Sequence, residues 1–198
     1  MGVNCGKKML HTGVRVGEIG RYVLIPGSVE RASLIANYFE NPRLLIHNRE
    51  FLTYVGRLDD IPVAVTSTGI GGPSMAITVE ELHQCGADTF IRVGSCASVS
   101  PIAGIGDVMV PCGAVRMEGL GEHFLPLEFP AVPDYQTFCC MVAAAKHCGY
   151  PYNAGITITK DSYYTEASPQ TKPVAEELIY KWKAYEKSGA TNTSMECA

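Results

Sequence analysis

An arginine lies inside an apolar segment of this chain. Arg92 interrupts the apolar run Phe90–Val93, which has the composition of a buried strand. A permanent positive charge in such a place is costly unless an anion meets it. Small-residue turns occur directly after this run, at Gly94–Ser98, and earlier, at Gly69–Ser74, and turns of this kind let a backbone approach a ligand closely. The pattern indicates an anion pocket, with phosphate as the leading candidate, and an internal salt bridge from Arg92 is the alternative.

Three more residues have the chemistry to bind the same anion. Gly27 follows an apolar run and precedes a helical pattern, so its N–H and the helix dipole favour an anion. Arg31 lies one turn into that helix and can reach the same place. Ser95 adds a hydroxyl donor beside the planar guanidinium of Arg92. A tight turn followed by a surface arginine is the alternative reading of the Gly27 segment.

The later part of the chain offers groups suited to a sugar and a base. The carboxylate of Glu196 can accept two hydroxyl groups, and the ring of Tyr163 can stack on a base. Lys160 can donate a proton to a leaving group or stabilise its negative charge. The alternatives are a solvated carboxylate, core tyrosines at Tyr163 and Tyr164, and a surface lysine.

Length and charge narrow the class of protein. The chain has 198 residues, of which 46% are hydrophobic and 18% charged, with a net charge of −4. We expect one globular domain over residues 1–198. The absence of a long basic run argues against a nucleic-acid-binding surface. No apolar run approaches the roughly 20 residues that a membrane helix needs, so we expect no membrane partner.

Cysteine and histidine spacing gives no metal signature. The chain has 8 cysteines, and none forms a C-x-x-C pair. The turn Gly69–Ser74 lacks the third glycine of a dinucleotide fingerprint. We therefore expect no metal and no organic cofactor, and free cysteines in a reduced, cytoplasmic setting. The cysteines are Cys5, Cys85, Cys96, Cys112, Cys139, Cys140, Cys148 and Cys197.

Strands and helices alternate along the chain, which predicts an α/β fold with a largely parallel sheet. Such sheets bind ligands at the carboxyl ends of their strands, where the turns at Gly27, Gly69–Ser74 and Gly94–Ser98 fall. Apolar, β-rich runs predict strands over Tyr22–Ile25, Ile61–Val65, Thr89–Val93, Val108–Val110 and Ile156–Ile158.

Capping residues and apolar stripes predict the helices. The first helix is capped by Ser28 and extends to about Phe39, with Leu34 and Ile35 facing inward. The last is opened by Pro173, with Val174, Leu178, Trp182 and Tyr185 on one stripe and Gly189 past its end. Between them, one helix has Pro73 in its first turn and ends at Gly86, and its inner face is formed by Met75, Val79, Leu82 and Cys85. Another helix begins at the cap Asp134 and ends at Gly149, and its inner face is formed by Phe138, Met141, Val142 and Ala145.

Taken together, these residues resemble the uridine phosphorylases of the nucleoside phosphorylase family. The resemblance covers almost the whole chain, and the segment Thr66–Ser74 is the most specific part. The other matching segments are Ile25–Gly27 with Arg31, His47–Phe51, Phe90–Gly94, Arg116–Gly119, Leu127–Val132, Lys160–Asp161 and Met195–Glu196.

The resemblance implies a three-layer α/β/α sandwich around a mixed, largely parallel sheet. It implies a pentosyltransferase of nucleoside salvage, which uses phosphate to release the base from a nucleoside, uridine above all, and forms ribose 1-phosphate. The family builds homo-oligomers from dimers, up to a hexamer. A nucleosidase, a purine-specific phosphorylase and a non-catalytic binder of nucleoside or phosphate are the alternatives. The family continues past the segment that matches Met195–Glu196, so the resemblance also implies an incomplete C-terminal section.

The resemblance also implies a role for each site residue. Phosphate is held by Gly27, Arg31, Arg92 and Ser95, with Arg49 supplied by a neighbouring subunit. Ribose is held by Ser95, Met195 and Glu196, with the neighbour's His11 toward the 5′ end. The base lies against Cys96, Ala97 and Tyr163, and Glu166 and Thr171 stand where the family has the glutamine and arginine that recognise the pyrimidine. The catalytic roles fall to Arg92, Lys160 and Glu196.

Overall fold

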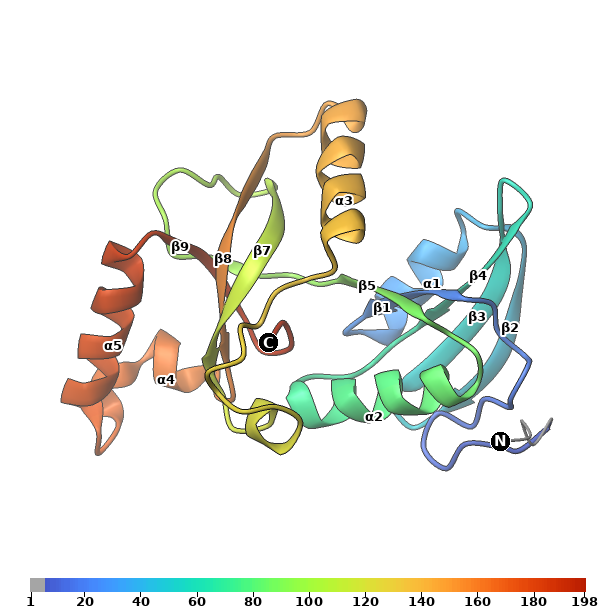
Figure 1. Ribbon diagram of the computed structural model, residues 1–198, viewed down its shortest axis with the longest axis horizontal. Coiled ribbons are helices and arrows are strands. Elements are labelled where there is room, and N and C mark those ends of the chain that lie inside the picture. Colours follow the sequence, from blue (N-terminus) through green and yellow to red (C-terminus); the bar gives the residue numbers. More distant parts are fainter. Residues whose placement is uncertain (1–5) are drawn as a thin grey trace. The chain divides into compact units, whose positions relative to one another are not determined.

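The computed structural model describes residues 6–198, so Cys5 lies outside the described residues. The chain divides into two compact units, Met1–Gly94 and Ser95–Ala198. The first contains β1 (Tyr22–Pro26), α1 (Val29–Ala36), β2 (Glu40–Asn48), β3 (Phe51–Leu58), β4 (Ile61–Thr66), α2 (Gly72–Gln84) and β5 (Thr89–Val93). The second contains β6 (Ala97–Ser98), β7 (Val108–Met117), η1 (Gly121–His123), α3 (Tyr135–Cys148), β8 (Tyr152–Lys160), α4 (Tyr164–Ala167), η2 (Pro169–Thr171), α5 (Ala175–Lys187) and β9 (Ala190–Ser194), and Figure 1 labels most of these elements.

The first unit is built on a five-stranded mixed sheet in the order β2-β3-β4-β1-β5. The central strand β1 runs parallel to both β4 and β5, whereas β2, β3 and β4 pair antiparallel. The carboxyl ends of β4, β1 and β5 therefore lie at one edge of the sheet. The β2–β3 turn lies at that edge too, because Thr53 near the start of β3 pairs with Thr66 at the end of β4.

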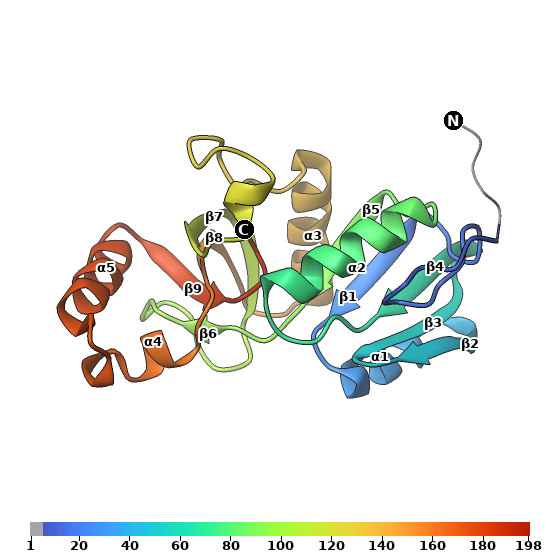
Figure 2. The same cartoon turned by 90° about the horizontal axis from the view of Figure 1, so that it is seen from below.

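Two helices cover opposite faces of this sheet, as Figure 2 shows. The alternation of β1 explains how both faces are filled. Val23 and Ile25 pack in a cluster with Met75 and Leu82 of α2 and with Cys85, the C-cap of that helix. Leu24 points the other way, into a cluster that contains residues of α1. The first unit is thus a three-layer α/β/α arrangement.

The second unit has its own sheet of four strands in the order β6-β9-β8-β7. The strands β7, β8 and β9 are parallel, and the short β6 pairs antiparallel with β9. Helix α3 packs on β7 and β8, and α5 packs on β9. Both units combine helices with a mixed sheet, so the predicted α/β class is confirmed.

Local signals placed several helix ends correctly. The Ser28 hydroxyl accepts a hydrogen bond from the Arg31 N–H at 3.2 Å, and the Asp134 carboxylate accepts one from the Thr137 N–H at 2.7 Å. Gly149 ends α3 with φ 71°, a left-handed conformation that favours glycine. Both predicted caps and this terminator are confirmed.

Other sequence-based expectations were wrong. Leu34 is 62% exposed instead of facing inward, and Val174 is 55% exposed because α5 begins only at Ala175. Helix α1 ends at Ala36, short of Phe39. The strands β2, β3 and β9 were not predicted. Strands β7 and β8 extend well beyond their predicted bounds. Among residues 6–198, no helix has the length and apolar character needed to cross a membrane.

Candidate functional site

Three predicted phosphate residues meet at the edge of the first unit where β1 and β5 end. The two strands are parallel neighbours, with Arg92 level with Ile25. Gly27 follows β1 directly, and Arg31 lies in the first turn of α1. The Arg31 Nη1 donates a hydrogen bond to the Val93 carbonyl at 3.2 Å, so its guanidinium lies at the end of β5. The fold thus brings two arginines and a glycine to adjacent strand ends.

Glycines make this edge compact. A Cβ on Gly94 would lie 1.4 Å from Nη1 of Arg92, which shows that the Arg92 side chain folds back over this glycine. A Cβ on Gly27 would lie 3.3 Å from the Gly69 carbonyl oxygen, and the Gly69 N–H donates to the Gly27 carbonyl at 2.9 Å. The two turns therefore approach each other through backbone, as expected where a chain closes around a small ligand.

Arg49 occupies the β2–β3 turn at the same sheet edge, with φ 54°. The neighbouring Glu50 is anchored, because its carbonyl accepts a hydrogen bond from the Ser67 hydroxyl at 2.5 Å. The turn lies between β2 and β3, three to four strand spacings of about 4.8 Å from β5, so the Arg49 backbone stands roughly 14–19 Å along the edge from that of Arg92. Arg49 is therefore at the far end of the edge from the Arg31–Arg92 pair.

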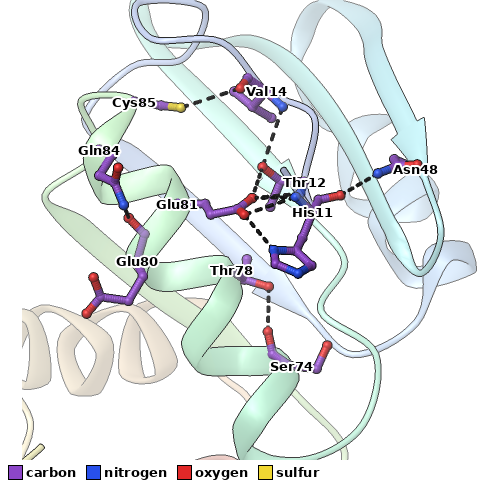
Figure 3. A network of polar contacts seen from close by, with 10 residues as sticks. All are labelled: His11, Thr12, Val14, Asn48, Ser74, Thr78, Glu80, Glu81, Gln84 and Cys85. Atoms are coloured by element: carbon purple, nitrogen blue, oxygen red, sulfur yellow. Dashed lines mark hydrogen bonds and ion pairs between the residues drawn. The ribbon is translucent and has the colours of Figure 1, made fainter. Parts of the chain in front are cut away.

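His11 belongs to a segment that packs beside this turn. The Asn48 side-chain amide donates to the His11 carbonyl at 2.6 Å, so the two residues that the resemblance assigns to a neighbour, His11 and Arg49, lie close together. The His11 ring contacts the carboxylate of Glu81 at 2.8 Å through Nδ1. Glu81 is 9% exposed, and Figure 3 shows the polar network around it.

The second unit gathers its predicted site residues around Thr193 in β9. The Lys160 ammonium, only 4% exposed at the end of β8, forms an ion pair with the carboxylate of Glu166 and donates to the Thr193 hydroxyl. That hydroxyl also lies 3.2 Å from the Glu166 carboxylate. The ammonium further lies 5.9 Å from the centre of the Trp182 ring. Lys160 and Glu166, predicted for separate roles, are thus one ion pair.

The remaining predicted residues of this unit flank the same strand. Ala97 of β6 pairs with Thr193, and the exposed Ser95 and Cys96 precede it. Met195 and Glu196 follow β9 directly, and the Glu196 N–H lies 3.5 Å from the Ser194 hydroxyl. The strand therefore connects the expected ribose and base positions within this unit.

Tyr163 and Thr171 lie on the surface of the same unit. Tyr163 is 56% exposed and meets Tyr164 edge to face, with ring centroids 5.3 Å apart. The Thr171 hydroxyl donates to the Ser168 carbonyl at 2.8 Å. The exposed ring of Tyr163 is accessible to solvent, as stacking on a ligand requires.

Sequence reasoning missed two polar residues that organise these sites, Glu81 and Thr193. Glu81 carried a usable signal, since it falls on the buried stripe of α2 with Thr78, Leu82 and Cys85 at helical spacing. Thr193 lies in Ala190–Ser194, a strand with little apolar character that gave no comparable signal. In the described part of the chain, no group of three or more His, Cys, Asp or Glu side chains is placed to hold a metal ion.

Comparison with known proteins identifies the family. A model of the phosphorylase superfamily matches residues 21–198. The chain belongs to the phosphorylase superfamily. It is 43% identical over 188 residues to a uridine phosphorylase of Treponema pallidum, which covers 95% of this chain and 73% of that protein. Over 141 residues it is 44% identical to the uridine phosphorylase of Escherichia coli, covering 71% of this chain and 56% of that protein. A guanosine phosphorylase of Halorubrum lacusprofundi is 34% identical over 160 residues, which is 81% of this chain and 66% of that protein.

These matches confirm the resemblance to uridine phosphorylases. The chain spans about three quarters of the Treponema protein and little more than half of the Escherichia coli relative. The matches name no residue roles, so the assignments of individual side chains remain predictions.

Proposed function

We propose that this protein catalyses the phosphorolysis of uridine to uracil and ribose 1-phosphate. The observation that carries the proposal is the pair of arginines at adjacent strand ends, Arg31 and Arg92, in a chain whose relatives are uridine phosphorylases. Guanidinium groups bind phosphate oxygens in a planar, two-pronged geometry. The same edge carries Gly27 and the start of α1, whose N–H groups favour an anion.

The reaction follows from holding phosphate against the nucleoside. A phosphate oxygen bonds to the anomeric carbon of the ribose, the glycosidic C–N bond breaks, and its electron pair leaves with the base, which takes up a proton. The sugar passes through an oxocarbenium-like state, which the bound phosphate stabilises. Met195 and Glu196 hold the ribose, and Glu196 accepts hydrogen bonds from its hydroxyls. The reaction requires no metal and no organic cofactor.

The proposed assembly is a homo-oligomer in the cytoplasm. His11 and Arg49 lie together at the far end of the sheet edge from the Arg31–Arg92 pair. This placement supports a site in which a second copy of the chain lends both residues. Tyr163 supplies a stacking surface for the base, together with Cys96, Ala97, Glu166 and Thr171. Lys160 lies at the end of β8 beside Glu166, close enough to influence this base-binding group.

The test is an assay of base release with and without phosphate, on uridine, inosine and guanosine. Uridine cleavage that requires phosphate supports the proposal, and equal cleavage in water would replace it with a nucleosidase. Preferred cleavage of guanosine would assign a purine phosphorylase, and binding without turnover would leave a non-catalytic binder. Replacing Arg92 with alanine should lower kcat/KM for phosphate about 100-fold, because charge-assisted hydrogen bonds are lost. Arg57→Ala is the matched control, since Arg57 pairs with Asp60 at the opposite end of β3.

A further inference from the structure

The carboxylate of Glu81 accepts several hydrogen bonds from a single segment of the first unit (Figure 3). It accepts from the backbone N–H of His11 at 3.0 Å and from that of Thr12 at 2.7 Å. It also accepts from the Thr12 hydroxyl at 2.9 Å and contacts the His11 ring at 2.8 Å. These donors come from a segment about 70 residues earlier in the chain.

The charge on this carboxylate determines that Nδ1 of the His11 ring carries a proton. Burial favours the neutral acid, but the N–H donors of Thr12 and His11 outweigh it and hold the pKa of Glu81 below its usual value. The group is therefore ionised near neutral pH and can only accept hydrogen bonds. Nδ1 of His11 then carries the proton of this contact, so in a neutral ring Nε2 is the nitrogen left to accept a hydrogen bond.

The backbone of His11 is held as firmly as its ring. Its N–H is bound by Glu81, and its carbonyl accepts from the Asn48 amide at 2.6 Å. Asn48 precedes Arg49, whose φ of 54° fixes the turn beside it. The His11 side chain is nevertheless 34% exposed, so the ring is oriented from below while part of it faces outward.

We propose that Glu81 is a positioning residue that fixes the Nδ1-protonated form of His11, so that Nε2 accepts a hydrogen bond from the 5′-hydroxyl of a nucleoside bound to a second copy of the chain. The proposal rests on the proposed function, because that function supplies the nucleoside. It assigns a specificity role to a residue that does not touch the substrate. It also explains why an ionised carboxylate is buried on the packed face of α2, where an apolar side chain would fit the stripe.

Glu81→Gln is the decisive variant. The amide keeps the shape of the side chain but turns an N–H₂ group toward donors, so the His11 ring loses its fixed orientation. Glu80→Gln is the matched control, because Glu80 is the exposed neighbour on the same helix and leaves His11 untouched. We expect E81Q to raise KM for uridine about tenfold, as for loss of one hydrogen bond, with little change for 5′-deoxyuridine or for the KM of phosphate.

A double variant separates a positioning role from a merely structural one. In the His11→Ala background, E81Q should add no further loss of uridine affinity, since both changes remove one interaction. A loss that persists in that background, or that affects 5′-deoxyuridine equally, would overturn the proposal.

The ring state is also measured without any activity. Nitrogen-15 NMR of histidine-labelled wild-type protein, with His11 assigned through H11A, should show Nδ1 protonated and Nε2 unprotonated in the neutral ring. The opposite tautomer would refute the proposal even if E81Q did not fold. Absence of phosphate-dependent cleavage in the wild-type protein would refute the proposed function, while this NMR result would still decide the role of Glu81 in orienting the ring.

Discussion

Removing the Lys160 ammonium should destabilise the second unit strongly. Lys160 is 4% exposed and its partner Glu166 is 19% exposed in its side chain, so Lys160→Met leaves a carboxylate largely shielded from water without its counter-charge. Breaking a buried ion pair on one side costs about 3–5 kcal/mol. The Glu166 carboxylate still accepts the hydrogen bond from the Thr193 hydroxyl at 3.2 Å and remains partly accessible to water. The expected loss of unfolding free energy is therefore near the lower limit, about 3 kcal/mol.

The chain contains a single tryptophan, which makes this loss measurable where it occurs. Trp182 lies 5.9 Å from the Lys160 ammonium, so urea unfolding followed by its fluorescence reports on the second unit. A loss of about 3 kcal/mol corresponds to a fall in Tm of about 6–12 °C for a chain of this size. Glu166→Gln alone should cost at least as much, because the ammonium it leaves is the more buried charge.

The double variant K160M/E166Q tests the reasoning itself. If the pair is coupled as the burial implies, the loss of unfolding free energy in the double variant should be about 2–3 kcal/mol smaller than the sum of the two single losses. Additive losses below about 1 kcal/mol each would refute it, since exposed ion pairs behave in that way. The same variants test the predicted catalytic role of Lys160. E166Q, which keeps Lys160, is the reference for this comparison. A kcat of the double variant well below that of E166Q would support that role, and equal kcat values would assign Lys160 to structure alone.

Three further predictions concern single sites. Gly155→Ala should lower the unfolding free energy by about 1–3 kcal/mol in a urea titration, because its Cβ would lie 2.4 Å from Cγ2 of Thr191. Gly104→Ala is the control: its Cβ would meet no atom nearer than 3.6 Å, so the unfolding free energy should change little. Because the pKa of Glu81 is lowered in the folded protein, its contribution to stability is complete above pH 4.5 and is lost as the pH falls further. The free energy of unfolding, measured against pH, should therefore fall less steeply below pH 4.5 for E81Q than for the wild-type protein. Burial is the largest cause that raises the pKa of Cys85 to about 11, and nearby carboxylates add to it. Iodoacetamide at pH 8 should therefore label the exposed Cys112 in native protein and Cys85 only after unfolding, which peptide mass spectrometry measures.

The parts of the fold that follow from short-range signals were predictable. The caps at Ser28 and Asp134 and the terminator Gly149 depend on contacts within a few residues. The strands β1, β4 and β5 have consecutive apolar residues because helices or loops cover both faces. Each of these features depends on residues that are close together in the sequence, and the structure has each of them at its predicted place.

The missed strands depend on pairing with other strands, which their own residue patterns do not show. Strand β9 contains almost no apolar side chain, yet all of Ala190–Ser194 is buried. Its polar groups are satisfied by β8 and its surroundings, as when the Thr191 hydroxyl donates to the Ile156 carbonyl at 3.1 Å. Strand β2 contains the dipeptide Asn41-Pro42, which is a local turn signal, and Asn41 has a positive φ of 50°. Pairing with β3 overrides those local preferences.

Arg92 was conspicuous in the sequence and Glu81 was not, for one physical reason. An arginine inside an apolar strand is conspicuous, because its cost is visible from the adjacent residues, and Arg92 was found in this way. A glutamate on a helix looks like a surface residue whether or not it is buried. Glu80 and Glu81 are adjacent and chemically identical, yet one is exposed and the other accepts hydrogen bonds from His11 and Thr12. Only the spacing of Glu81 from the buried Thr78 and Cys85, three and four residues away, distinguishes them, and that spacing shows burial without naming the partner. The role of such a carboxylate therefore becomes readable only when the fold places its donors.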